Sequence, residues 1–366
     1  MVFARCCLNA FAVRPRVAMT ASAISTSDPE FSAETLSGAR GWFHRFAANL
    51  IRDERDVPFV RLMVQATLVV VPFAILLFFY FRWALALAYI AVNFLVFVDR
   101  YILMLHNTSH RLLFRPRYHV LNLYIPWVLG PFFGESPETY FAHHVGMHHP
   151  ENNLPPDLSS TMRFERDNVW HFVRYFSRFF FLVLFDLRRY LAFHSRKRLA
   201  KKCTFGELSF LALVFALMFV NAKATFVVFV IPFVFVRFMM MAGNWGQHAF
   251  IDATQPGNSY VNSITCINTR YNRRCFNDGY HIGHHVKATR HWTEMPGDFR
   301  ANIARYAQEG SIVFEGIDFF QVWLFLMCKR YDTLAERYVA LDGVNRTREE
   351  VVLLLRSRTR AIPVPS

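Results

Sequence analysis

Histidines gather in three short boxes along the chain. Fifteen histidines occur among 366 residues, and most of them fall in these boxes. The boxed positions, with a single histidine between boxes two and three, are His106 and His110 (box one); His143, His144, His148 and His149 (box two); His248; and His281, His284 and His285 (box three). Imidazole nitrogen is a ligand for iron, copper, zinc and nickel. The boxes therefore predict metal binding.

The spacing within the boxes suits helices. Residues four apart on a helix lie on one face, so His106 and His110 are expected to bind one metal ion together. The same relation joins His144 to His148, while His149 points about a third of a turn away. In box three, His284 and His285 follow His281 by three and four residues, so two adjacent histidines again accompany a single one. Such an arrangement lets one helix supply ligands to two ions at once.

Two histidine triads and a further pair in one chain are not explained by chance. A lone histidine, in contrast, usually has a structural role, which we assign to His44, His119, His171 and His194. One ambiguity remains inside box two, where His143 competes with its neighbour for the ligand role. The four-residue spacing favours the neighbour as the ligand.

The composition points to the membrane. Hydrophobic residues make up 54% of the chain and the mean hydropathy is +0.19, yet 41 Lys and Arg against 27 Asp and Glu give a net charge of +14. This hydrophobicity excludes a disordered chain, and six scattered cysteines exclude a disulfide scaffold. A nucleic-acid binder would be less apolar, so we expect no nucleic-acid partner.

Four apolar stretches are candidates for membrane spans. They are Met63–Phe81, Trp83–Val98, Leu208–Val220 and Ala224–Met241. A span needs about 20 residues, which the first stretch meets and the second meets by continuing to Leu105, whereas the third must borrow flanking residues. The stretches pair into two hairpins whose short tips lie at Arg82 and at 221–223.

The positive charges indicate the orientation. Each tip carries one basic residue, so nearly all other Lys and Arg lie on the opposite side, which the positive-inside rule makes cytosolic. Every box falls on that side. We therefore predict an all-α membrane protein, with four transmembrane helices in two hairpins and a cytosolic helical cap that carries the histidine boxes. Two broken apolar runs, Val120–Phe133 and Phe172–Leu187, are predicted to be interfacial or re-entrant.

We divide the chain into an N-terminal tail (1–58), a membrane domain (59–330) and a C-terminal cytosolic tail (331–366). No acidic residue precedes Asp28, a composition that suits an organelle transit peptide but also an unstructured cytosolic tail. The predicted location is accordingly the endoplasmic reticulum or a plastid or mitochondrial membrane, with the boxes facing the cytosol, stroma or matrix. A capping-box pattern at Thr347 predicts a short surface helix near the C-terminus.

Over roughly residues 60–300, the chain resembles the membrane fatty-acid desaturase/hydroxylase superfamily. The most specific feature is box three with its Asn277-x-Gly-Tyr lead, which looks like lipid desaturases in particular. The resemblance implies a non-haem centre of two irons, with O2 as co-substrate. The implied ligands are His106, His110, His144, His148, His149, His248, His281, His284 and His285. Asn244 matches a position that holds a water on one iron in acyl-CoA desaturases.

The implied reaction is the removal of two hydrogens from the acyl chain of a lipid. No His-Pro-Gly-Gly haem signature is present, so electrons would come from a separate donor of the cytochrome b5 or ferredoxin type. Box two reads H-x-x-x-H-H, whereas many desaturases have H-x-x-H-H. Because the longer form also occurs in alkane hydroxylases, a hydroxylase or ketolase with the same di-iron centre remains an alternative.

Two other classes fit less well. A metal transporter would place ionisable residues inside its spans, and these spans have almost none. A haem cytochrome would pair histidines within facing spans, whereas the boxes are expected outside them. Near the boxes, five carboxylates are candidates for orienting the imidazoles: Asp278, Asp252, Asp157, Glu151 and Asp99.

Overall fold

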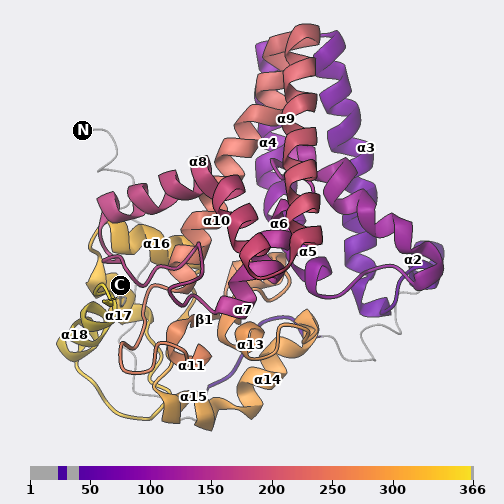
Figure 1. Cartoon of the computed structure of the whole chain (residues 1–366). Coiled ribbons are helices and arrows are strands. Elements are labelled where there is room, and N and C mark those ends of the chain that lie inside the picture. The colour runs from indigo at the N-terminus through magenta and orange to yellow at the C-terminus, as the bar shows by residue number, and fades with distance from the viewer. Residues whose placement is uncertain (1–23, 31–40, 364–366) are drawn as a thin grey trace.

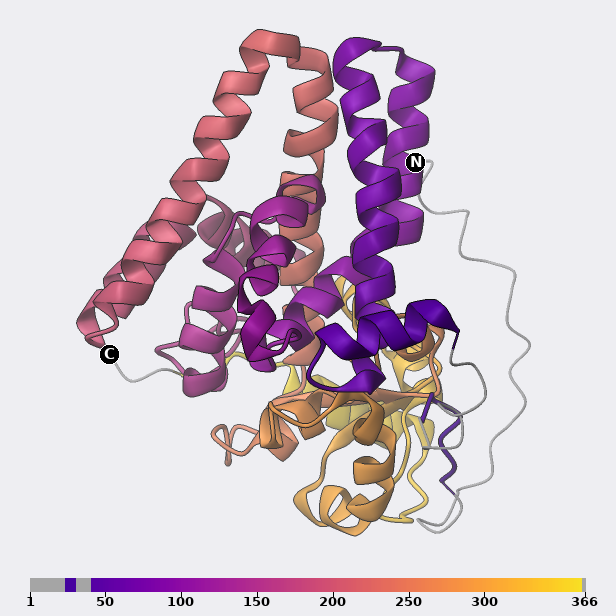
Figure 2. The ribbon, with the colours of Figure 1, turned by 90° about the vertical axis from the view of Figure 1, so that its right-hand side faces the viewer.

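The computed structural model describes residues 24–30 and 41–363. The stretch for which we predicted targeting character lies mostly before residue 24, outside the described residues. The structure is mostly helical, with a tower of long helices above a cap (Figures 1 and 2); the tower is narrower than the cap in the view of Figure 1. The tower consists of α3 (Val57–Phe79), α4 (Trp83–Val92), η3 (Asn93–Phe97), α5 (Val98–His110), α9 (Lys197–Thr225), η8 (Phe226–Val230) and α10 (Ile231–Gln247).

Three helical stretches of the described chain are long and apolar enough to cross a membrane: Glu54–Phe79, Trp83–His110 and Lys197–Gln247. The third is 51 residues long and reverses direction at Asn221, whose backbone is non-helical (φ −156°, ψ 95°). Figure 2 shows this reversal at the top of the tower. The bends occur where the sequence predicts the hairpin tips, and Asn221 Nδ2 donates to Phe78 O at the end of α3 (3.1 Å).

The outer faces of the tower are apolar and exposed. Large side chains such as Leu68, Phe79, Leu95 and Phe219 are each more than two-thirds exposed. Exposed apolar surface of this extent is unfavourable in water and suits contact with lipid tails. The candidate spans thus indicate an integral membrane protein.

Box one lies on a continuous helix with the second span. We expected it just past the end of that span, whereas Trp83–His110 runs unbroken for 28 residues. At 1.5 Å per residue such a helix is about 42 Å long, which exceeds the ~30 Å hydrocarbon layer. The last turns, with His106 and His110, can therefore extend beyond the apolar layer without a break in the helix.

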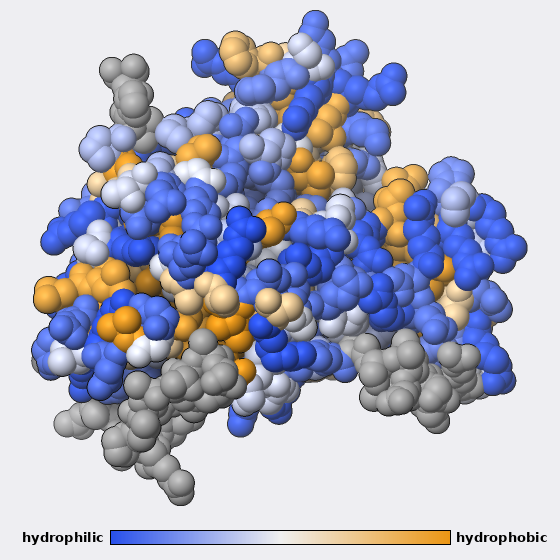
Figure 3. All heavy atoms as spheres, turned by 90° about the horizontal axis from the view of Figure 1, so that it is seen from below, coloured by the Kyte–Doolittle hydropathy of each residue, from blue (hydrophilic) through white to orange (hydrophobic). Residues whose placement is uncertain are grey.

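The cap collects the remaining elements, of which all but α8 are short. They are α2 (Trp42–Leu50), η2 (Glu54–Asp56), η4 (Pro116–Leu123), η5 (Ile125–Leu129), η6 (Gly130–Phe133), α6 (Thr139–His143), η7 (His144–His148), α7 (His149–Glu151), α8 (Val169–Phe193), α11 (Ser259–Asn262), α12 (Arg270–Arg274), α13 (His281–Val286), η9 (Trp292–Glu294), α14 (Met295–Ala301), α15 (Ile303–Glu309), α16 (Phe319–Met327), α17 (Tyr331–Arg337) and α18 (Arg348–Arg358). Seen from below, the molecule is mostly hydrophilic, as expected of an end that faces water (Figure 3).

The cap also contains a small parallel sheet that the all-α prediction misses. Strands β1 (Ile264–Ile267) and β2 (Ile312–Glu315) pair in register from Ile264 opposite Ile312 to Ile267 opposite Glu315. Each strand has only four residues, and β1 is buried throughout. A short apolar run without alternation cannot be distinguished from a helix by periodicity, which explains the miss.

The C-terminal capping box is confirmed. Thr347 Oγ1 accepts from the Glu350 N–H (3.2 Å), and the Glu350 carboxylate accepts from the Thr347 N–H (2.7 Å). The helix that follows, α18, buries Val351 and Leu355 in a cluster with Leu334 of α17. The C-terminal segment is thus packed onto the cap.

Candidate metal centre

Nine histidines meet where the tower joins the cap. They form two groups, and within each group the candidate ligand atoms lie within 4.8 Å of one another. Group one is His106, His110, His144, His149 and His284; group two is His148, His248, His281 and His285. These nine are the ligands that the family resemblance implies.

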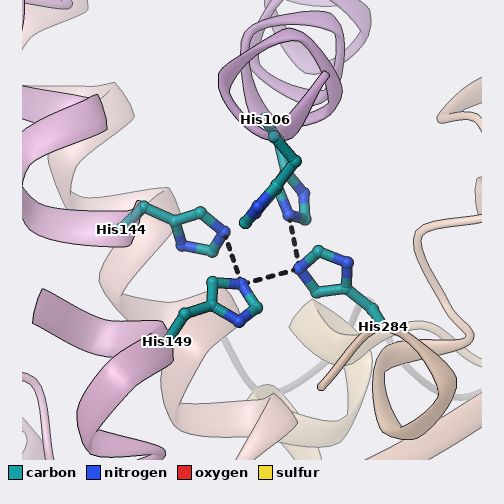
Figure 4. Close-up of side chains that lie close together, drawn as sticks. His106, His144, His149 and His284 are labelled. Carbon is teal, nitrogen blue, oxygen red and sulfur yellow. Dashed lines mark hydrogen bonds between the residues drawn. The ribbon is translucent and has the colours of Figure 1, made fainter. Parts of the chain in front are cut away.

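Group one draws its imidazoles from all three boxes: two from box one, two from box two and one from box three. Nε2 of His284 lies 2.9 Å from Nε2 of His106 and 2.9 Å from Nε2 of His149, which in turn is 3.1 Å from Nε2 of His144. Figure 4 shows these four rings pointing toward one another from α5, η7, α7 and α13. His110 completes the group with its ring centroid 4.5 Å from that of His149. Its buried Nε2 has no hydrogen-bond partner among the described residues.

Group two lies directly beside group one. Ring centroids of His148 and His248 are 5.3 Å apart, and His285 lies 5.2 Å from the former and 5.0 Å from the latter. Nε2 of His281 is 3.3 Å from Nε2 of His248. Nε2 of His285 is buried without a partner among the described residues. Buried polar atoms are normally satisfied, so this nitrogen fits a site that a metal ion completes.

Box two distributes its histidines differently from our prediction. We expected His144 and His148 to share an ion, but His144 joins His149 in group one while His148 joins group two. The reason is the π-helical turn η7, which covers His144–His148. A π-turn closes i→i+5 instead of i→i+4, so the residue five positions along, His149, returns to the face of His144.

Box three reaches the same result with an ordinary α-helix. On α13, His281 and His285 are four apart and both belong to group two, whereas His284 points to group one. His144 and His149 of box two likewise share one group, while His148 between them belongs to the other. Each of these two boxes thereby serves both groups.

Three acceptors fix the imidazole tautomers from outside. Nδ1 of His106 lies 3.0 Å from Asp278 Oδ1, Nδ1 of His148 lies 2.7 Å from Asp157 Oδ2, and Nδ1 of His248 lies 2.8 Å from the Asn262 carbonyl. A carboxylate or a carbonyl can only accept, so each Nδ1 carries the proton and donates it. The lone pair on each Nε2 is then free to bind a metal.

Two of the five candidate carboxylates therefore contact the histidine groups. The other three pair elsewhere: Asp99 with Arg274, Asp252 with Arg358, and Glu151 with Tyr190. Sequence reasoning missed the Asn262 carbonyl, because a backbone acceptor leaves no signal in residue type. It also gave no role to His291, which is buried and donates from Nε2 to Asp56 (3.0 Å).

Burial favours the neutral form of several grouped imidazoles. Burial first, and then repulsion from neighbouring rings, lowers the pKa of His144, His281, His284 and His285 well below the usual 6.5. The same causes lower the pKa of His248 to about 3. Neutral imidazole is the form that binds metal, so the site can accept a cation at neutral pH without losing protons.

Asp157 has the opposite role. Burial opposes its ionisation, but His148 and the Ser159 hydroxyl stabilise the carboxylate and lower its pKa to about 2. Its side chain also accepts from the Ser159 and Asn153 N–H groups. The anion is therefore held in place at neutral pH, ready to orient His148.

His143 and Asn244 line a cavity beside the groups. His143 lies outside both groups, with its ring 5.3 Å from Phe179. Asn244 donates from Nδ2 to Tyr175 Oη (2.7 Å) and to Ser159 O (3.1 Å). His171 accepts from the Glu165 N–H, a local contact that agrees with the structural role assigned to it.

The cavity has a volume of about 400 Å³. Apolar side chains from η3, α5, α10 and α16 form much of its wall, among them Phe94, Ile102, Phe235, Met239, Met240 and Phe320. His106, His144, His148 and His281 lie on the same wall. An apolar ligand in the cavity would thus contact both histidine groups.

Comparison with known proteins adds one finding. Residues 81–315, well over half of the chain, match the model of the family described as fatty acid desaturase. The matched region contains all nine grouped histidines. Comparison with curated proteins and with solved structures gave no match.

Proposed function

The chain belongs to the fatty acid desaturase family, and on that premise we propose that it is an O2-dependent lipid desaturase that removes two hydrogens from an acyl chain. The observation that carries this proposal is the convergence of nine imidazoles into two adjacent groups beside an apolar cavity. The family implies an oxidoreductase with a lipid substrate. The reaction, the metal and the electron donor are our proposals.

We propose that each histidine group holds one iron. The donors fit, because imidazole is a good ligand for iron, and Nε2 of His110 and Nε2 of His285 are buried with no partner in the described part of the chain. When bound, a pair of irons supplies the electrons and the oxidising power that no side chain has. Asn244, whose side chain faces the cavity, would hold a water near the site.

The side chains have the task of positioning. The apolar wall would exclude water and hold one segment of the acyl chain against the histidine groups. Asp157 and Asp278 would hold the imidazoles of His148 and His106 in the tautomer that binds metal. Where the acyl chain lies against these groups would determine which carbons lose hydrogen.

In the membrane, we propose four spans in two hairpins, with α9 and α10 as the second hairpin. The bend at Asn221 and the exposed apolar faces of the tower support this arrangement. The domain limits 59–330 and the cytosolic, stromal or matrix location of the cap belong to the same proposal. Electrons would come from a separate cytochrome b5 or ferredoxin type of donor.

The test is lipid profiling in a desaturase-deficient host. The natural chain, His284→Ala and the control His171→Ala are expressed, and the amount of each protein in the membrane is measured. New double bonds that persist with His171→Ala and disappear with His284→Ala support the proposal. Hydroxylated lipid would favour the hydroxylase alternative that box two suggests, and a profile identical to the empty host would contradict both.

A further inference from the structure

A short N-terminal segment is packed against the chain around box three. Residues 24–30, which we call the strap, lie beside the region of α12 to α14 (Figures 1 and 2). Ile24 joins a buried cluster that includes Tyr280 and Ile282. Glu30 and Thr26 both accept from Arg300 of α14. The strap is thus held at both of its ends.

Asp28 is the centre of these contacts, and the residue is only 5% exposed. Its Oδ2 accepts from the Asn268 N–H (2.7 Å), from Asn272 Nδ2 (2.9 Å) and from Tyr280 Oη (2.7 Å). Its Oδ1 accepts from the Thr269 N–H (3.2 Å). No cation among the described residues forms an ion pair with it, so four donors from the loop 268–280 balance the buried charge.

Tyr280 and Asn272 connect Asp28 to the histidines of box three. Tyr280 immediately precedes His281, and its carbonyl accepts from the His284 N–H (3.1 Å). Asn272 donates to Asp28 and to the Cys266 carbonyl, while its Oδ1 accepts from the Gly279 N–H (2.9 Å). The Gly279 carbonyl in turn accepts from the Cys266 N–H (2.8 Å).

The backbone of the loop is closely packed at Gly279. A Cβ added at Gly279 would lie 2.3 Å from Asn272 Oδ1 and 2.4 Å from the Cys266 carbonyl. Asn277 also donates from Nδ2 to the Pro29 carbonyl of the strap (2.8 Å) and to the Trp292 carbonyl (3.0 Å). The strap therefore supplies hydrogen-bond acceptors, the Asp28 carboxylate and the Pro29 carbonyl, to side chains of the loop.

We propose that Asp28 is a positioning residue of the metal centre, and that the strap is a part of the site that the N-terminal region must supply. It acts through Tyr280 and Asn272 on the histidines of α13, which serve both groups. The inference depends on the proposed function only in taking those histidines as metal ligands. One consequence is that removal of a targeting segment has to leave Asp28 on the mature chain.

The four donors around residue 28 require a carboxylate, in which both oxygens accept hydrogen bonds. In Asp28→Asn, one oxygen becomes an NH2 group that faces a backbone N–H, of Asn268 or of Thr269, in either orientation of the amide. Backbone donors cannot turn away, so one hydrogen bond is replaced by an unfavourable contact of two donors. Asp28→Ala removes all four acceptor contacts. Glu30→Gln, in the same strap, alters an exposed ion pair and leaves the Asp28 contacts intact.

The experiment compares the full chain with Asp28→Asn, Asp28→Ala and the control Glu30→Gln. Hydrogen exchange of residues 266–286 is measured on metal-free protein, and iron retention and the Mössbauer spectrum are measured on loaded protein. We expect at least tenfold faster exchange at Cys266 and Gly279, and a ten- to hundredfold weaker hold on iron, in both Asp28 variants only. A variant that does not fold loses protection throughout the tower, which the exchange data also report.

The outcomes separate the two proposals. If the natural chain holds two irons and both Asp28 variants match Glu30→Gln in exchange, iron retention and spectrum, the role of Asp28 is overturned. If the natural chain binds no iron, the proposed function fails. Exchange in the metal-free protein still decides whether Asp28 orders the loop.

Discussion

Boxes two and three each supply histidines to both groups, but box two does so with a π-helical turn and box three with an α-helix. Box two contributes His144 and His149 to one group and His148 to the other, and box three contributes His281 and His285 to one group and His284 to the other. Box three does so within α13, with spacings of three and four, whereas box two has one residue more and absorbs it in the π-turn η7. A π-turn is the form in which a helix accommodates a single added residue. The comparison teaches that the group a histidine joins depends on the helical period as well as on the spacing.

The largest expected effect separates the neighbours in box two. His149→Ala and His144→Ala should each disturb the iron of group one, and His148→Ala that of group two. We expect all three variants to lose turnover while remaining in the membrane. The Mössbauer spectra should show one altered signal shared by the first two variants and a different altered signal in the third. A common signal for His144→Ala and His148→Ala would instead support the α-helical arrangement, in which these two histidines bind the same iron.

Deleting Val145 tests the π-turn itself. Val145 lies between the histidines of box two, and its removal converts the box to the H-x-x-H-H spacing of box three. If η7 only absorbs an added residue, an α-helical turn replaces it and both groups keep their histidines. We expect the deletion variant to retain two irons per chain, with activity reduced by less than about tenfold. Loss of iron from either group would show that the π-turn is itself required.

A smaller effect is expected from the carboxylates that orient the imidazoles. Asp278→Asn affects group one through His106, and Asp157→Asn affects group two through His148. Such partners typically contribute 10- to 100-fold in metal affinity or activity. Iron release to a chelator should be faster in both variants, and Asp252→Asn, whose carboxylate pairs with Arg358, should release iron at the natural rate. Equal rates in all four proteins would contradict this role.

The smallest effect concerns pH and the metal-free protein. Burial lowers the pKa of His144 and His285 well below the usual 6.5 in the folded chain, and it lowers the pKa of His248, which lies between the boxes, to about 3. As the pH falls below about 6.5 the unfolded chain binds protons first, so the free energy of unfolding should fall steadily toward pH 3. Thermal unfolding between pH 7 and pH 4 measures this. A melting temperature independent of pH would refute the prediction.

Much of the site could be predicted from the sequence, because histidine type and spacing are local signals. The grouped histidines of the three boxes, the tips at Arg82 and Asn221, and the capping box at Thr347 were readable in this way, whereas the lone His248 was assigned through the family resemblance. The partition of box two was not, because a π-turn and an α-turn share the same residue types. The sheet of β1 and β2 was missed because four buried residues show no period.

Asp28 could not be predicted from the sequence for a different reason. Its partners, Asn268, Asn272 and Tyr280, are 240 to 252 residues away along the chain, and only the fold brings them together. The one local signal was that Asp28 is the first acidic residue of the chain, which we used as evidence about targeting. Long-range polar contacts of single residues leave no pattern that spacing can reveal.

The central claim is that the two histidine groups hold two irons. Its most direct test is metal analysis of the full chain purified from membranes, together with an absorption spectrum. The account predicts about two irons per chain, no Soret band from haem, and loss of iron in His284→Ala but not in His171→Ala. A chain that carries zinc alone, or one iron bound equally well by His284→Ala, would contradict it.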